Sequence, residues 1–392
     1  MLLCGAGPIE REFGGFFRQL AGVLRTEYDI TLFEGGGTAV SEGKVPSLFG
    51  PLQVISRLLP FGGLEIEGAY TEYKRRCLAF GLSLAPALLK GRFDIVHFID
   101  PPMATILPRL RRAFGLSYRL LFTEASSISP PFYPRDTHIH QISPATMQEA
   151  LIMGIPASMM TLAPCALTLP AFAPTSSRAE LRLKHSVDER AFLILANTDV
   201  RRIQKRVHYL IDEVSRLDSD ALLWINGCPE DPAVADLAAR KLGRRCRLTN
   251  LPPREVQELY TMADVFVHAA VQEPFGMPIA QALCSGLPVL VHNSAHYGWL
   301  TQDPGCLVEM RKPGSLADRL RDAAVTRAQL AQQASEKAPI MRNRLAWETL
   351  RPLYLRMYAQ LAGGSTVAGE VRPEDRLPHP VSQAAQRIEA GR

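Results

Sequence analysis

The sequence predicts an α/β protein with two Rossmann-like domains, each a doubly wound parallel sheet, that face each other across a cleft. Three observations predict this fold class. At 392 residues the chain is longer than one typical core needs, so two domains are expected. Short apolar runs alternate with amphipathic helical stretches, which is typical of parallel βαβ units. A stretch rich in proline and small residues, LAPCALTLPAFAPTSSRAE, separates two such series and indicates a linker.

The first series of elements runs from the N-terminus to this linker. MLLCGAG predicts a strand, and GGFFRQLAGVLRTE predicts a helix because its apolar residues recur at helical spacing. DITLFEG, FDIVHFID and YRLLFTEA predict three more strands, with ATILPRLRRAFG as a helix between the last two. We therefore expect an N-terminal domain over residues 1–170.

The second series begins near residue 190. The predicted strands are AFLILANTD, ALLWINGCP, CRLTNLP, DVFVHAAV and LPVLVHN, and the predicted helices include QKRVHYLIDEVSRL, PAVADLAARKLG and REVQELYTMA. These elements predict a C-terminal domain over residues 171–343, followed by a closing amphipathic helix over 344–362. The tail 363–392 is polar and contains proline and glycine, so we expect it to be disordered.

The composition narrows the classes of function. A net charge of +5 is mild for this length, and no basic-aromatic pattern predicts a nucleic-acid partner. Seven scattered cysteines without a C-x-x-C pair argue against a zinc site or a disulfide framework. No signal peptide is recognised, and the longest apolar run, CLAFGLSLAPALL, is too short to span a bilayer. We expect a cytoplasmic protein; the basic EYKRRC before that run leaves open a peripheral contact with the inner face of the membrane, with a buried helix as the alternative.

The stretch VQEPFGMPIAQALCSGLPVLV carries the first chemical signal. Its EPFG loop follows a predicted strand and leads into a helix that begins near Met277 or Pro278, where proline is favoured because its missing N–H is not needed. The amides of Phe275, Gly276 and Met277 would face an anion at the positive end of this helix. Glu273 would lie at the mouth of the strand, where a carboxylate can accept hydrogen bonds from hydroxyl groups. A purely structural corner is the alternative.

A second loop, NTDVRRIQKR, carries the matching positive charge. It follows the strand AFLILA and contains Arg201, Arg202, Lys205 and Arg206 at a helix start. Ligands of open parallel sheets bind outside the carboxyl ends of the strands, which is where both loops fall. Fixed cations there would neutralise a diphosphate leaving group, whereas a merely solvated helix start is the alternative.

These motifs resemble those of the GT-B nucleotide-sugar glycosyltransferases, in particular the retaining family 4. ANTDVRRIQKR, LLWINGCPE, CRLTNLPPREVQELYTMADVFVHAAV and EPFGMPIAQALCSGLPVLV follow the order and spacing of that family over about residues 190–330. FGGFFRQLAGVL, FDIVHFIDPP and HQISPATMQEALIMGIP resemble its N-terminal segments more loosely. The resemblance implies the GT-B fold, with the late AW helix crossing back to the N-terminal domain.

The resemblance also implies a role for each matching residue. Lys205, together with Arg201 or Arg202, would hold the nucleotide diphosphate, and Glu273 would contact hydroxyl groups of the donor sugar; Lys205, Arg202 and Glu273 are the implied catalytic group. The other positions implied in donor binding are Gly14, Gly15, Phe275, Gly276, Met277 and Gln281.

The chain departs from the family pattern in four places. A denser basic cluster replaces the arginine and lysine of the family's GR…KG loop, and PCA at 164–166 stands where PNG is usual. The other two departures concern Gln281 and the N-terminal histidine. Gln281 stands where the family carries the glutamate that binds the ribose; an amide can still bond hydroxyl groups. The family's N-terminal histidine falls near Ile99, and His97 on the same strand face is a candidate cleft residue, with a satisfied core position as its alternative. Asp100 and His296 are further candidate cleft residues.

The resemblance implies a retaining glycosyltransferase that moves a hexosyl-type unit from a nucleoside-diphosphate sugar to a hydroxyl acceptor. The acceptor would be a glycan or a lipid-linked sugar, in glycan, polysaccharide or glycolipid biosynthesis. No metal and no cofactor beyond the co-substrate is expected, because the DSD at 218–220 falls in a predicted turn. Two alternatives stay open: a binding or scaffold subunit of the same fold, and a sugar-nucleotide epimerase. The base, the sugar and the oligomeric state are not specified.

Overall fold

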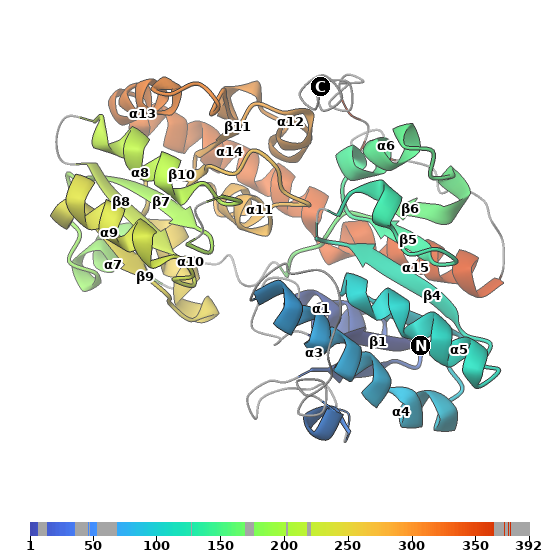
Figure 1. The fold of residues 1–392 in the computed structure, drawn as a ribbon. Helices are drawn as coiled ribbons and strands as arrows, with labels where there is room; N and C mark the ends of the chain where they lie inside the picture. Colours follow the sequence, from blue (N-terminus) through green and yellow to red (C-terminus); the bar gives the residue numbers. More distant parts are fainter. Residues whose placement is uncertain are drawn as a thin grey trace. The chain divides into compact units, whose positions relative to one another are not determined.

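The computed structural model of the protein forms two compact units (Figure 1). It describes residues 1–6, 14–35, 46, 48–52, 69–126, 128–168, 176–200, 203–217, 221–363, 372, 375 and 377. Unit 1 contains Met1–Ala166 and takes up the chain again from Leu350, whereas unit 2 contains Leu167–Thr349. Most of the tail that was predicted to be disordered lies outside the described residues.

Unit 1 is built on a six-stranded parallel sheet with the order β2-β1-β3-β4-β5-β6. Its strands are β1 (Leu2–Gly5), β2 (Thr31–Glu34), β3 (Ile95–Phe98), β4 (Arg119–Glu124), β5 (His138–Gln141) and β6 (Met160–Leu162). Its helices are α1 (Gly14–Leu24), α3 (Ala69–Ser83), α4 (Ala85–Lys90), α5 (Leu107–Ala113), α6 (Pro144–Ile152) and, for most of its length, α15 (Trp347–Gly363). Apolar residues of the strands pack with those of α3, α4, α5 and α6 in one apolar core.

Unit 2 repeats this architecture with the strand order β12-β11-β10-β7-β8-β9, again parallel throughout. Its strands are β7 (Phe192–Asn197), β8 (Ala221–Asn226), β9 (Cys246–Thr249), β10 (Val265–His268), β11 (Val289–His292) and β12 (Leu307–Val308). Its helices are α7 (Arg178–Lys184), α8 (Val207–Ser215), α9 (Pro232–Lys241), α10 (Pro253–Met262), α11 (Met277–Cys284), α12 (Ala295–Thr301), α13 (Ser315–Val325) and α14 (Arg327–Leu345). Its core is a second, separate apolar cluster.

The predicted fold class is confirmed by two parallel six-stranded sheets with helical connections. Three strands were not predicted: β5, β6 and β12. Their sequences, HIHQ, MTL and LV, are either polar or too short to give a hydrophobic period, so only their pairing with neighbouring strands identifies them. The closing helix predicted over 344–362 corresponds to α15, which begins at Trp347 because the preceding helix α14 extends to Leu345.

A buried chain of hydrogen bonds ties α15 to the sheet of unit 1. The hydroxyl of Tyr358 lies 2.7 Å from Nδ1 of His97, whose Nε2 lies 2.6 Å from the hydroxyl of Thr123. That hydroxyl lies 2.8 Å from Nδ1 of His140, whose Nε2 lies 2.8 Å from the carbonyl oxygen of Ala163. The carbonyl can only accept, so His140 donates from Nε2 and, step by step, the Tyr358 hydroxyl donates to His97. Each imidazole accepts one hydrogen bond and donates one in this chain, so both histidines must be neutral.

The two histidines therefore make folding sensitive to acid. Burial lowers the pKa of His140 to about 4, and burial together with the nearby His140 lowers the pKa of His97 well below its ordinary value. An unfolded histidine titrates near pH 6.5, so between about pH 6.5 and 4 the unfolded chain binds more protons than the folded one. Stability is thus fully present above pH 6.5 and falls as the pH drops through this window.

We predict that the free energy of unfolding falls by up to about 3 kcal/mol per buried histidine between pH 7 and pH 4. Urea unfolding followed by circular dichroism at a series of pH values measures this slope. His140→Gln removes one titrating group from the chain and is expected to flatten the slope, although it lowers stability at pH 7. An unchanged slope in this variant would contradict the assignment of His140 as a neutral buried group.

Candidate functional site

The strand order of unit 2 reverses direction between β10 and β7. From β7 the chain proceeds outward through β8 and β9, and then returns to pair β10 with β7 on the other side. The helices that follow β7 and β10 therefore leave on opposite faces of the sheet, and in open parallel sheets ligands bind at such a reversal, outside the carboxyl ends of the strands. The loops after β7 and β10 are those that contain Lys205 and Glu273.

The structure brings Lys205 and Glu273 into direct contact. Nζ of Lys205 donates to Oε1 of Glu273, and Nε2 of His268, the last residue of β10, lies 2.9 Å from the same oxygen. An ionised carboxylate only accepts, so His268 donates from Nε2. The side chains are 9%, 7% and 2% exposed for Lys205, Glu273 and His268 respectively, which places the whole group away from bulk water.

The two donors decide the charge of Glu273. Burial alone would raise the pKa of this carboxyl, but the hydrogen bond and charge of His268 and the charge of Lys205 outweigh it and lower the pKa to about 2. Glu273 is therefore an ionised acceptor at neutral pH. A carboxylate fixed in this state can take hydrogen bonds from the hydroxyl groups of a ligand.

The loop after Glu273 turns sharply into α11. Gly276 is its N-cap with φ 93° and ψ 53°, a left-handed conformation that favours glycine. A Cβ at this position would lie 2.8 Å from Cδ1 of Ile279, so a larger residue would also collide with the helix. The first amide that bonds within this turn is that of Ile279, which donates to the carbonyl of Gly276. The amides of Phe275, Gly276 and Met277 precede that bond, as the sequence predicted for an anion-binding helix start.

A row of polar side chains continues from this point along the carboxyl edge of the sheet. Asn197 and Asn226 end β7 and β8, and Nδ2 of Asn226 donates to Oδ1 of Asn197 at 3.0 Å. Nδ2 of Asn197 donates to the hydroxyl of Tyr260 at 3.0 Å, and this hydroxyl lies 3.1 Å from Oε1 of Gln281. Thr249 at the end of β9 donates to Asn226 at 3.0 Å. Gln281 is thus held by a continuous hydrogen-bonded row.

The basic loop after β7 is only partly described. Arg201 and Arg202 lie outside the described residues, so their predicted roles stay predictions. Arg206 is turned into the protein: its guanidinium donates to the carbonyls of Ala269 and Met310 at 3.3 and 3.0 Å and lies 4.3 Å from the ring centre of Tyr209. Arg206 therefore fixes the loop and is not a free cation for a ligand.

The candidates in unit 1 lie in structural positions. Gly14 and Gly15 are the first residues of α1, the chain before them lies outside the described residues, and their role in donor binding stays a prediction. His97 belongs to the buried chain of hydrogen bonds and has no exposed surface. Asp100, directly after β3, accepts from the amide of Ala6 at 2.6 Å and from the hydroxyl of Tyr73 at 2.9 Å, and burial raises its pKa.

His296 supports the α11 loop from behind. Its Nε2 donates to the carbonyl of Phe275 at 2.9 Å, and burial lowers its pKa to about 4. The ring of Phe275 is fully buried and packs against Trp299, with ring centres 6.0 Å apart. His296 therefore positions the backbone of the loop, and its role as a cleft residue stays a prediction.

Sequence reasoning missed His268, Asn197, Asn226 and Tyr260. The signal was present for three of them, because β7, β8 and β10 are apolar runs that each end in a polar residue, LILAN, LLWIN and VFVH. A polar side chain at the carboxyl end of a buried parallel strand faces the region where ligands bind. Tyr260 comes from helix α10, and only the tertiary contact with Gln281 identifies it.

Two general properties of the described residues complete the site. In the described ranges, no group of three or more His, Cys, Asp or Glu side chains is arranged to hold a metal ion. No helix among the described residues is long and apolar enough to cross a membrane. The DSD at 218–220 lies outside the described residues.

The segment that contains Lys205 and Glu273 is similar to known proteins. Residues 190–324 match the family model "Glycosyl transferases group 1". The lipopolysaccharide glucosyltransferase WaaG of Escherichia coli is 29% identical over 170 residues, which cover 42% of this chain and 45% of WaaG. Alpha-galactosylglucosyldiacylglycerol synthase of Streptococcus pneumoniae is 22% identical over 249 residues, 60% of this chain and 63% of the synthase. The chain thus spans less than two thirds of the length of either curated relative.

A solved structure covers nearly the whole chain. HepE of Anabaena, in complex with UDP and glucose, aligns with a TM-score of 0.70 at 14% identity, covering 92% of this chain and all of HepE. At this identity the likeness shows the fold, which is GT-B. The protein therefore has the GT-B fold, and residues 190–324, within its unit 2, match the model of the glycosyl transferases group 1 family.

The contact between Lys205 and Glu273 predicts a strong energetic coupling. Lys205→Met leaves the buried carboxylate with His268 alone and is expected to destabilise unit 2 by about 3 kcal/mol. Adding Glu273→Gln removes the stranded charge, so the double variant is expected to lose clearly less than the two single variants together. Urea unfolding of the four proteins measures this coupling.

The chain offers a matched surface pair as the control. Lys184 and Glu258 also form an ion pair, at 2.7 Å, but the lysine side chain is 55% exposed. Lys184→Met is expected to cost less than about 1 kcal/mol, because a solvated pair contributes little. Equal losses for the two lysine variants, or strictly additive losses at Lys205 and Glu273, would contradict the buried coupling.

Proposed function

We propose that the protein is a glycosyltransferase that moves a hexosyl unit from a nucleoside-diphosphate sugar to a hydroxyl acceptor. The observation that carries this proposal is the contact of Lys205 and His268 with Glu273 at the switch point of unit 2. This group lies within the segment that matches the glycosyl transferases group 1 family. It combines a cation, a fixed carboxylate and a helix start, which are the groups that a sugar diphosphate needs.

In this proposal, Lys205 exchanges partners when the donor binds. Without ligand its ammonium is bonded to Glu273. A diphosphate carries more negative charge than one carboxylate and lies nearer the start of α11, so it competes for the ammonium. His268 keeps its hydrogen bond to Glu273 throughout, and the carboxylate stays ionised and oriented. Glu273 is then available to accept hydrogen bonds from the hydroxyl groups of the donor sugar.

The chemical step requires stabilisation of the leaving nucleoside diphosphate. Negative charge grows on its phosphate oxygen as the bond to the sugar carbon breaks, and a fixed ammonium at that oxygen lowers the barrier. We assign this role to Lys205 and the amides before α11, with Arg202 as a predicted second cation. Gln281, which is bonded to Tyr260, is the proposed partner of the ribose hydroxyls. An amide replaces the family's carboxylate there and still bonds hydroxyl groups in both directions.

The proposed substrates follow from the relatives. WaaG is named a lipopolysaccharide glucosyltransferase, the second relative is named as the synthase of a glycosyldiacylglycerol, and HepE was solved with UDP and glucose. These names support a UDP-hexose as the donor and a sugar hydroxyl on an envelope glycolipid or glycan as the acceptor. A cytoplasmic location and contact with the inner face of the membrane stay predictions.

We predict that the protein binds a UDP-, GDP-, ADP- or dTDP-hexose and releases the nucleoside diphosphate when a hydroxyl acceptor is added. Calorimetry measures binding, and a coupled assay for released diphosphate measures turnover. Lys205→Met is expected to lower kcat by about a hundredfold or more, because it removes one fixed charge from the leaving group. Binding of the donor without turnover on any glycan or glycolipid acceptor would favour a binding subunit, and formation of an epimer from the donor alone would favour an epimerase.

Retention of configuration and independence of metal ions are part of the proposal. In this proposal the cationic role in leaving-group departure belongs to Lys205, so activity is expected to survive an excess of EDTA unchanged. Retention predicts that an α-linked donor gives an α-linked product, which the anomeric coupling constant in a proton NMR spectrum of the first product reports. If EDTA abolishes activity and added Mg²⁺ or Mn²⁺ restores it, metal independence is refuted. A β-linked first product would refute retention of configuration.

A further inference from the structure

A pocket lies in unit 2 at the amino edge of the sheet, whereas the site described above lies at its carboxyl edge. Asp264 directly precedes β10 and Pro288 directly precedes β11, and both line a cavity of about 400 Å³. Glu273 and His268 lie at the other ends of these strands, and a four-residue strand spans roughly 10 Å or more. The cavity is large enough for a small molecule of the size of a sugar phosphate.

Three arginines from two helices line this pocket. Arg178 begins α7, and Arg327 and Arg342 lie at the start and near the end of α14. A guanidinium offers five N–H donors in a fixed planar arrangement that matches the oxygen atoms of phosphate and carboxylate groups. Clustered arginines in a cavity therefore indicate an oxyanion as the ligand.

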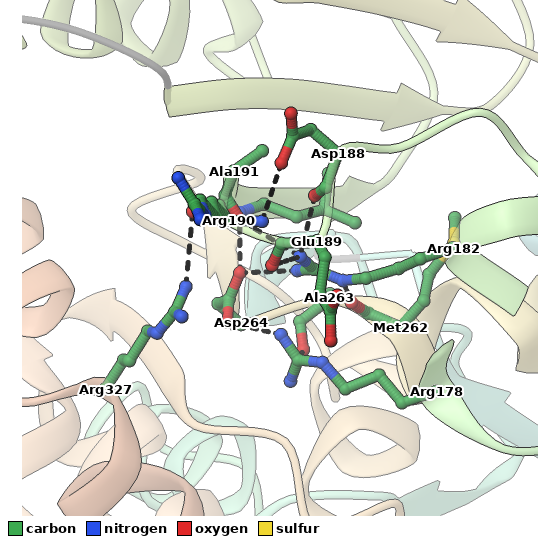
Figure 2. A network of polar contacts seen from close by, with 11 residues as sticks. Arg178, Arg182, Asp188, Glu189, Arg190, Ala191, Met262, Ala263, Asp264 and Arg327 are labelled. Atoms are coloured by element: carbon green, nitrogen blue, oxygen red, sulfur yellow. Dashed lines mark hydrogen bonds and ion pairs between the residues drawn. The ribbon is translucent and has the colours of Figure 1, made fainter. Parts of the chain in front are cut away.

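One of the two carboxylates in the lining is already fully engaged (Figure 2). Asp264 accepts from Arg178 and Arg182, and also from the amide of Leu193 at 2.7 Å. Arg182 is almost completely buried and completes its bonds with backbone carbonyls around the network, those of Asp188, Glu189, Ala191 and Met262. Asp264 thus compensates the buried Arg182 and part of Arg178. The other carboxylate in the lining, Glu189, is on an exposed residue.

The two arginines of α14 retain donors for a ligand. Arg327 makes one long hydrogen bond, 3.4 Å from its Nη1 to the carbonyl of Arg190, as Figure 2 shows. Arg342 donates from Nε to the carbonyl of Cys284 at 2.6 Å, which leaves the two terminal nitrogens of its guanidinium. Within the described part of the chain, neither arginine is paired with a carboxylate.

The charges around Arg327 are unfavourable without an anion. It is the first residue of the 19-residue helix α14, whose first turn contains no acidic residue and whose N-cap, Thr326, makes no side-chain capping bond. A positive charge at the positive end of a helix is repelled by the helix dipole. Burial lowers the pKa of Arg182, and the charges of Arg178 and Arg327 add to this effect while Asp264 opposes it. A bound anion would relieve both repulsions.

We propose that this pocket is a second ligand site of unit 2, which binds a small, multiply charged oxyanion of the phosphate-ester class. Arg327 and Arg342 bind the anionic groups, and Arg178, whose charge Asp264 compensates in part, lines the same pocket. The site is separate from the carboxyl edge of the sheet, so it is a place for an effector or a second ligand and not for the transferred sugar.

Pyrophosphate is the probe, and isothermal calorimetry measures its binding to the full chain. Lys205→Met serves as the background, because it weakens any binding at the carboxyl edge; its urea unfolding curve first establishes that it is folded under the assay conditions. In this background, Arg327→Gln together with Arg342→Gln is expected to weaken pyrophosphate binding by at least about tenfold, since two charge-assisted contacts are lost. Arg321→Gln is the matched control, because it removes one exposed arginine of unit 2 from α13 and is expected to leave the affinity within about twofold.

Two further results decide the proposal. Arg327→Gln alone removes only the long hydrogen bond to Arg190, so the midpoint of urea unfolding is expected to stay unchanged. The affinity for pyrophosphate is expected to fall in the same variant. Arg342→Lys keeps the charge and is expected to recover part of the affinity. Absence of pyrophosphate binding in the Lys205→Met background, or equal affinity with and without the α14 arginines, would overturn the proposal. Neither result bears on the glycosyltransferase activity, which the donor assay tests separately.

Discussion

The structure of unit 2 depends on a buried carboxylate that is shared by two donors. Glu273 would be costly to bury alone, and Lys205 would be equally costly without a partner. His268 and Lys205 compensate the carboxylate together. The contact links the loop after β7 with the loop after β10, and so it fixes both sides of the switch point at once. Because Gly276 follows three residues later, the same contact also orients the start of α11.

The two edges of the unit 2 sheet carry different polar networks. At the carboxyl edge, the polar ends of β7, β8 and β9 form a hydrogen-bonded row that reaches Gln281 through Tyr260. At the amino edge, Asp264 and the buried Arg182 fasten the strands to α7 and the end of α10. In unit 1 a carboxylate also links two loops at the carboxyl edge, where the strand order reverses between β1 and β3. Asp100, after β3, accepts a hydrogen bond from the amide of Ala6, after β1.

Much of the fold and part of the candidate site were predictable from the sequence, and the features that were not predicted have physical reasons. The long amphipathic helices and apolar strands of unit 2 gave clear periods, and the spacing of EPFG and the proline after it predicted the turn into α11. The sequence could not show that His268 contacts Glu273, because a histidine at the end of an apolar strand has the same pattern whether it is a ligand or a core residue. His97 has such a pattern too, and in unit 1 it belongs to a buried chain that the tertiary contact with Tyr358 completes. The arginine pocket combines residues from α7, α10 and α14 and has no local motif at all.

The most direct measurement of the central contact is the pKa of the Glu273 carboxyl itself. Carbon-13 NMR of the protein labelled at glutamate side-chain carboxyls, assigned by the loss of one resonance in Glu273→Gln, follows its ionisation as the pH is lowered. The shared contact with Lys205 and His268 predicts a pKa of about 2, so the resonance stays at its ionised position through pH 4. Titration near the ordinary glutamate value of about 4.3 would show that the carboxylate is solvated and uncoupled, and would contradict the account.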